Sequence, residues 1–208
     1  LKNVIFLLAM LKMFLIFGQN FDEKKRIVID VGHGGKDSGA IGRNGILEKD
    51  IVLNVAKEIM RLNNSILDDG FDIYLTRYCD TFISLADRSR LAKVLDVDVF
   101  VSLHCNAFKN NSKGIEVYVH QSKNGEVISS LALGKAILYE STQKLGFENR
   151  GLKSANFQVL RETVGFCPSV LVEIGFVSNI EEGDYFLKPS NIRAMALAIL
   201  VGIYNYLR

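Results

Sequence analysis

The apolar and polar residues of the chain follow two patterns that alternate from one end to the other. Short apolar runs are typical of buried strands, whereas apolar residues that recur every three or four positions are typical of helices packed on a core. The runs predict strands near 27–29, 71–76, 99–103, 114–120, 157–160 and 169–172. The recurring positions predict helices at about 48–68, 84–95, 127–145 and from 190 onward. Because strands alternate with helices, we expect an α/β fold: a single domain with a mostly parallel central sheet and helices on both faces.

Serines stand at the predicted start of two of these helices. Ser84 and Asp87 have the spacing of a capping box, in which the serine side chain accepts a backbone N–H of the first turn. Ser190 is expected to cap the last helix in the same position.

The first eighteen residues differ from the rest in composition. Lys2 is followed by an apolar run over 4–17, and Gly18 provides a small residue before a cleavage point. We therefore expect a signal peptide at 1–18, a short segment at 19–25 and a single folded domain at 26–208, in a protein exported to the periplasm or cell envelope. The alternative is a retained anchor, but Lys12 interrupts a run that is short for a bilayer, so no stable membrane anchor is expected.

Charge and cysteine content exclude some classes of function. The chain has 25 Lys and Arg against 23 Asp and Glu, and loss of residues 1–18 would remove two lysines and leave a neutral domain. A neutral domain does not predict a nucleic-acid partner. The three cysteines have no C-x-x-C spacing, which argues against a disulfide framework and against a cysteine zinc site.

Polar side chains stand at the ends of three predicted strands. His33 follows the first strand between glycines, His104 follows the strand at 99–103, and Glu173 follows the strand at 169–172. Glu48 stands where a glycine-rich loop meets the first helix. If the strands are parallel neighbours, all four side chains converge at one edge of the sheet, where open α/β sheets place their ligand sites.

Two imidazoles and one carboxylate are a usual ligand set for a catalytic zinc ion (Zn²⁺), which activates water, and the second carboxylate would then serve as general base. Spacing alone does not show which carboxylate binds the metal and which acts as the base. Glu48, in a polar loop, suits a ligand, whereas Glu173, in apolar surroundings, suits a base with a tunable pKa. Each residue also has an ordinary interpretation, a turn histidine at a strand end or an acid that favours a helix dipole.

Six motifs, read together, resemble the zinc-dependent N-acetylmuramoyl-L-alanine amidases known as the amidase 3 family. They are Ile-Asp-Val-Gly-His-Gly-Gly (29–35), Gly-Ile-Leu-Glu-Lys-Asp (45–50), Leu-Thr-Arg (75–77) with Asp80, Leu85 and Arg88, Ser-Leu-His-Cys-Asn-Ala (102–107), Arg-Gly-Leu-Lys (150–153) and Val-Glu-Ile-Gly-Phe-Val-Ser-Asn (172–179). The resemblance implies that His33, Glu48 and His104 bind zinc and that Glu173 is the catalytic acid and base. Val31 departs from it, since a proline is common there.

The activity implied by the resemblance is hydrolysis of the amide between N-acetylmuramic acid and the first L-alanine of the peptidoglycan stem peptide. Two alternatives stay open: a zinc peptidase acting within the stem peptide or cross-bridge, and a catalytically silent wall-binding module. Besides peptidoglycan, an activator or localising protein is a candidate partner. Some family members carry a helix that plugs the zinc site, and we expect the 127–145 helix not to do so.

Asn106 and Arg88 are candidate substrate-binding residues, Asn106 through its amide and Arg88 through a stem-peptide carboxylate. The alternatives are an asparagine that stabilises a turn and an arginine that pairs with Asp87 or another acid.

Overall fold

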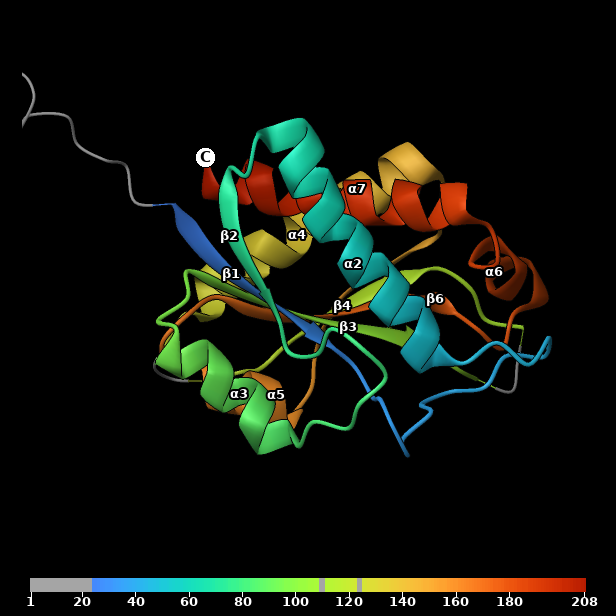
Figure 1. Cartoon of the computed structure of the whole chain (residues 1–208), viewed down its shortest axis with the longest axis horizontal. Helices are drawn as coiled ribbons and strands as arrows, with labels where there is room; N and C mark the ends of the chain where they lie inside the picture. Colours follow the sequence, from blue (N-terminus) through green and yellow to red (C-terminus); the bar gives the residue numbers. More distant parts are fainter. Residues whose placement is uncertain (1–23, 109–110, 123–124) are drawn as a thin grey trace, which may run out of the picture.

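The computed structural model describes residues 24–108, 111–122 and 125–208 (Figure 1). The expected signal peptide at 1–18 lies outside the described residues, as does most of the segment at 19–25. Within the described part, no helix combines the length and apolar character needed to cross a membrane.

A six-stranded sheet forms the centre of the molecule. Its strands are β1 (Lys25–Val31), β2 (Phe71–Leu75), β3 (Val99–Asn106), β4 (Ile115–Val119), β5 (Asn149–Ser154) and β6 (Ser169–Phe176). They lie in the order β2-β1-β3-β6-β4-β5. The first four strands of this order are parallel, and β4 pairs with β6 in the antiparallel sense while β5 runs parallel to β4. The predicted mostly parallel sheet is confirmed.

Helices cover both faces of the sheet, as the alternating pattern predicted. They are α2 (Glu48–Leu67), α3 (Leu85–Val94), α4 (Val127–Leu145), α5 (Gln158–Thr163), α6 (Ile180–Tyr185) and α7 (Pro189–Leu207). The larger core lies between the sheet and α2, α4 and α7. A smaller core lies on the opposite face, where α3 packs against α5 (Figure 1).

The face covered by α3 and α5 changes character along the strands. Val28, Phe100 and Leu171 of β1, β3 and β6 belong to the smaller core. Side chains two residues apart in a strand share a face, so Asp30, Ser102 and Glu173 follow these residues on the same side. The face is therefore apolar near the start of the strands and polar toward their carboxyl ends.

One predicted strand is wrong. Residues 157–160, expected to be extended, contain the start of α5, and the strand β5 lies just before them at Asn149–Ser154. Val159 and Leu160 are buried in the smaller core. A short apolar run suits a buried helix turn as well as a strand, so its pattern could not distinguish the two.

The two predicted caps had different outcomes. Ser84 caps α3, since its side chain accepts a hydrogen bond from the backbone N–H of Asp87. Ser190 does not cap α7, because the helix begins one residue earlier at Pro189 and Lys188 occupies the cap position. A proline at the first helical position has the φ angle that a helix requires, which explains the earlier start.

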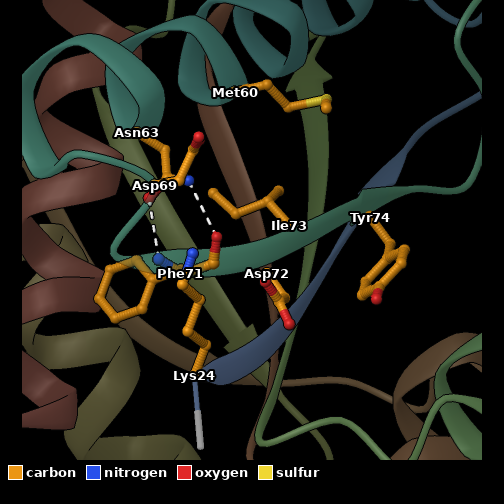
Figure 2. Close-up of a pocket in the computed structure, with 8 residues that line it drawn as sticks. All are labelled: Lys24, Met60, Asn63, Asp69, Phe71, Asp72, Ile73 and Tyr74. Carbon is orange, nitrogen blue, oxygen red and sulfur yellow. Dashed lines mark hydrogen bonds between the residues drawn. The ribbon is translucent and has the colours of Figure 1, made fainter.

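A surface cavity beside the edge strand β2 lies away from the polar strand ends. Its lining includes Lys24 and the first four residues of β2, 71–74, at the amino end of the strand. Figure 2 shows Asn63 of α2 exchanging two hydrogen bonds with the backbone of Phe71. These contacts join α2 to the start of β2, and the cavity contains no side chain from the predicted site.

Candidate metal centre and active site

His33, Glu48 and His104 meet at the carboxyl ends of the parallel strands. His33 Nε2 lies 3.0 Å from Glu48 Oε1, His104 Nδ1 lies 2.9 Å from the same oxygen, and the two nitrogens are 3.1 Å apart. The three side chains form the one group in the described part of the chain with the composition and spacing to hold a metal ion. Three predicted residues, from the loop after β1, from α2 and from β3, are therefore brought together.

Glu48 is held as a carboxylate by the backbone around it. It is the first residue of α2 and is buried. Oε1 accepts a hydrogen bond from the N–H of Cys105 at 2.9 Å, and Oε2 accepts one from the N–H of Ala40 at 2.7 Å. Burial opposes the charge, but hydrogen bonds and charges of His104 and His33 outweigh it and lower the pKa of Glu48 to about 2. The carboxylate is therefore anionic at neutral pH and has the charge of a metal ligand.

His33 is oriented by a second carboxylate. Its Nδ1 lies 2.9 Å from Asp37 Oδ2, so a proton on Nδ1 leaves the lone pair of Nε2 facing Glu48 and His104. Carboxylates in this position fix the ring and tautomer of metal-binding histidines. Burial opposes protonation of His33, but Glu48 and Asp37 outweigh it and raise its pKa. Asp37 was not predicted, although its position four residues after a glycine-flanked histidine was a usable signal.

Glycine is required where the loop over the site approaches the ligands. Gly39 has φ of +63°, and a Cβ there would lie 2.5 Å from Glu48 Oε2 and 2.6 Å from His33 Cδ2. A Cβ at Gly32 would lie 2.6 Å from the His104 ring. Any side chain at these positions would displace the three donor atoms, so the glycine-rich pattern serves the geometry of the site.

Glu173 lies beside this group on the next strand. The register of β3 and β6 places it opposite His104. Its Oε2 is buried and has no hydrogen-bond partner among the described residues. Burial is the main cause that raises the pKa of Glu173 to about 7, with Glu48 and Glu116 adding to it and His104 opposing it. A carboxyl group of this pKa can take up and release a proton near neutrality.

The donor atoms fit a catalytic zinc ion in number, type and spacing. Ligand atoms at about 2.0–2.1 Å from a tetrahedral zinc are separated by roughly 3.3 Å, and the three separations here are close to 3 Å. Two histidines and a glutamate leave a fourth position open, as in zinc hydrolases. The unpaired Glu173 oxygen is a polar group on the same side of the sheet, next to His104.

Arg88 differs from its expected role. Its side chain is 3% exposed and forms an ion pair with Asp30 at 2.9 Å. Its remaining donors reach the backbone oxygens of Ile83, Val31 and His33. These contacts engage the guanidinium beneath the loop that carries His33, so Arg88 is not positioned to bind substrate. Its role is the alternative one, an arginine that pairs with an acid.

Asp30 and Arg77 are two further residues that sequence reasoning missed. Asp30, buried in β1, also accepts hydrogen bonds from Thr76 Oγ1 and Ser102 Oγ. Arg77, 2% exposed, donates to the backbone oxygens of Gly32 and Val31. An ionisable residue within an apolar strand is costly unless paired, and that signal was available for Asp30.

Asn106 lies at the last position of β3, half-buried, and its Nδ2 donates to Glu116 Oε1 at 2.7 Å. It also lines a cavity between the ends of β3, β4, β5 and β6. Its candidate role in substrate binding stays a prediction.

The helices between His104 and Glu173 lie on the faces of the sheet. Within the described residues of this segment, α4 packs against α7 and β4, and α5 packs against α3. The 127–145 helix therefore lies outside the group of His33, Glu48 and His104, as expected.

Comparisons with known proteins agree with this geometry. Residues 27–205 match the family model described as N-acetylmuramoyl-L-alanine amidase. The chain is 35% identical to the uncharacterized protein YqiI of Bacillus subtilis, over 88% of this chain and 85% of YqiI. The solved amidase AmiC2 of Nostoc punctiforme superposes with a TM-score of 0.79 at 35% identity, covering 88% of this chain and 97% of AmiC2.

A second solved structure is that of the CwlD amidase from Clostridioides difficile in complex with the GerS lipoprotein. CwlD superposes with a TM-score of 0.80 at 29% identity, covering 88% of this chain and 98% of CwlD. The chain spans 85%, 66% and 35% of the lengths of the first three curated relatives it matches. Several relatives thus contain segments beyond the shared domain.

Proposed function

Since the chain belongs to the N-acetylmuramoyl-L-alanine amidase family of peptidoglycan hydrolases, we propose that it cleaves the amide between N-acetylmuramic acid and L-alanine in a zinc-dependent reaction. His33, Glu48 and His104 would hold the zinc ion through Nε2, Oε1 and Nδ1. The number, type and spacing of these donor atoms support the assignment.

A zinc ion bound there would polarise the scissile carbonyl and make a water molecule acidic enough to attack it at neutral pH. The protein supplies the proton transfers. Glu173, as a carboxylate, would accept the proton of the attacking water at Oε2. It would then donate that proton to the amide nitrogen as the L-alanine amine departs.

The observation that carries this proposal is the buried Oε2 of Glu173, which has no hydrogen-bond partner in the described part of the chain and lies on the strand next to that of His104. A buried carboxyl oxygen without a partner is costly for stability, so its retention beside three metal-binding side chains is best explained by a catalytic task. A binding module would need no base beside the metal.

The substrate implies where the protein acts and with what it associates. We propose that it is exported and acts in the cell envelope, because peptidoglycan lies outside the cytoplasmic membrane. CwlD, of similar fold, is solved with a lipoprotein. That complex supports the proposal that an activator or localising protein is a partner of this chain.

The test is release of free stem peptide from purified peptidoglycan, measured by mass spectrometry and by labelling of new amino termini. The zinc-loaded enzyme should release intact stem peptides that begin with L-alanine. Chelation should abolish release, and added zinc should restore it. Glu173→Gln should bind zinc with little change and lose at least about a thousandfold in kcat, consistent with loss of general acid–base catalysis. Glu181→Gln, on the exposed surface of α6, is the matched control.

Other outcomes would contradict the proposal in different ways. New termini within the stem or cross-bridge would indicate a zinc peptidase. Zinc binding with no cleavage in the presence of intact peptidoglycan would favour a silent binding module. Full activity of Glu173→Gln would remove Glu173 from the reaction.

A further inference from the structure

A cavity of about 310 Å³ opens next to Glu173, on the side away from the metal-binding group. Its lining includes Asn106 of β3, Glu116 and Tyr118 of β4, Arg150 and Lys153 of β5, and Phe176 of β6. The strand register places Glu116 opposite Glu173, which in turn lies opposite His104. His104, Glu173 and Glu116 therefore form one row across three neighbouring strands.

Arg150 extends this row onto β5. Ile115 pairs with Asn149 and Val117 pairs with Leu152, so two residues of β5, Arg150 and Gly151, stand opposite Glu116 alone. Such a bulge turns a side chain in a new direction. Arg150 Nε donates to Glu116 Oε2 at 3.0 Å, and the guanidinium lies 4.9 Å from the centre of the Phe176 ring. The guanidinium is thus fixed on two sides.

Glu116 is hydrogen-bonded to four of the other side chains that line the cavity. The residue is 2% exposed, and its two oxygens accept hydrogen bonds from Asn106, Tyr118, Arg150 and Lys153. Burial opposes its charge, but Lys153, Tyr118 and Arg150 outweigh that effect and lower the pKa of Glu116. One carboxylate is therefore held in place by four donors.

The charges lining the cavity do not balance. Arg150 and Lys153 carry two positive charges against one negative charge on Glu116. Their side chains remain 29% and 36% exposed, so both reach the cavity and solvent. Arg150 Nε donates to Glu116 and Nη1 donates to the backbone oxygen of Lys113, which leaves Nη2 without an acceptor among the described residues. One positive charge and at least one fixed donor are left for an anion, and a planar guanidinium held in this way suits a carboxylate.

Resting on the proposed amidase function, we propose that this cavity binds a free carboxylate on the second residue of the stem peptide and selects stems that carry it. One strand spacing, about 5 Å, separates the strand of Glu173 from that of Glu116. The Arg150 guanidinium reaches back to Glu116, since its Nε lies 3.0 Å from Glu116 Oε2. Two residues of an extended peptide span about 7 Å, which is enough to pass from Glu173 over Glu116. A stem peptide that leaves the metal centre along the row reaches the cavity near its second residue.

The experiment compares two soluble muramoyl peptides that differ only at the second stem residue, which carries a free carboxyl group in one and a carboxamide in the other. The ratio of their kcat/KM values is measured for the zinc-loaded wild type, Arg150→Gln, Lys153→Met and the control Lys57→Met, an exposed lysine on α2. Because each ratio is internal to one variant, partial misfolding affects both rates alike and leaves the ratio unchanged.

The wild type and Lys57→Met should prefer the carboxylate by about tenfold to a hundredfold, as expected for hydrogen bonds to a charged group. Arg150→Gln and Lys153→Met should lose most of this preference. Equal rates for the two compounds with the wild type would overturn the inference, as would a preference that survives in both variants. A third compound, amidated only farther along the stem, should match the carboxylate; a lower rate there would overturn the assignment to the second residue.

The same data separate this inference from the proposed function. If both compounds release free stem peptide at equal rates, the amidase function stands and the selective cavity fails. If neither compound is cleaved at the muramoyl amide, both proposals fail together.

Discussion

Arg88 donates a hydrogen bond from Nη2 to the backbone oxygen of His33 at 2.8 Å, which links a buried helix side chain to the loop that carries this proposed metal ligand. His33 has φ of +58°, a conformation that non-glycine residues rarely adopt. The backbone oxygen of Val31 also accepts from Arg88, at 2.5 Å. The buried pair of Arg88 and Asp30 therefore holds this loop in a strained conformation.

Loss of Arg88 should destabilise the fold strongly. Arg88→Ala leaves Asp30 buried without its cation, which costs about 3–5 kcal/mol in the free energy of unfolding. Urea denaturation measures this value. Arg90→Ala is the control, since Arg90 is 74% exposed and pairs with Asp87, and such surface pairs contribute about 0–1 kcal/mol. Equal effects of the two substitutions would contradict the structural role of Arg88.

An alanine at Gly39 should abolish metal binding, because its Cβ would occupy the space of Glu48 Oε2 and the His33 ring. We expect zinc affinity to fall by at least a hundredfold in competition with a chromophoric chelator. Gly45→Ala separates this clash from backbone strain: Gly45 has φ of +80° but no atom within 4 Å of a Cβ. It should cost about 1–2 kcal/mol of stability and leave zinc affinity unchanged. A similar loss of affinity in both variants would exclude the steric explanation.

Asp37→Asn should weaken zinc binding by about tenfold to a hundredfold, the usual effect of removing a carboxylate that orients a metal-binding histidine. The substitution keeps the shape of the side chain but removes the charge beside His33 Nδ1. Zinc titration followed by calorimetry gives the affinity. Asp50→Asn, an exposed residue of α2, is the control and should bind zinc like the wild type. An unchanged affinity for Asp37→Asn would show that Asp37 does not orient the ring.

The stability of the metal-free protein should depend on pH through Glu173. The pKa of Glu173 is about 7 in the fold, against 4.5 for the ordinary carboxyl group, so the folded state holds the proton more tightly. Above about pH 7 the ionised group costs about 3 kcal/mol, and this cost disappears as the pH falls toward 4.5. Glu173→Gln should therefore be more stable than the wild type at pH 8 and equal to it near pH 4.5. A difference that does not vary with pH in chemical denaturation would contradict the raised pKa.

The positions of His33, His104 and Glu173 could be predicted because each follows a short apolar run, and parallel strands bring their carboxyl ends to one edge. The strands β3 and β6 continue past these runs, so His104 and Glu173 lie within them. Glu48 could be predicted from the junction between a glycine-rich loop and a clear helical pattern. These inferences use local periodicity and one rule of sheet topology.

The surroundings of the site could not be predicted in the same way. The neighbourhood of Glu116 and Glu173 depends on the reversed direction of β4, and nothing local in the sequence sets the direction in which two distant strands pair. The roles of Arg88 and Arg77 depend on backbone oxygens of the first strand and its loop, more than fifty and more than forty positions away in the chain. Arginine is usually a surface residue, and nothing in the sequence around these two arginines indicates that they are buried. Only the packing of the folded chain shows it.

The three proposed metal-binding side chains are far apart along the chain, with 56 positions between Glu48 and His104 and 71 between His33 and His104. They meet only after β1 and β3 have paired and α2 has docked on the sheet. An unfolded chain therefore does not hold the three donor atoms together around one metal ion. If the protein crosses a membrane unfolded, as the proposed export implies, the proposed zinc ion would bind on the far side, after folding.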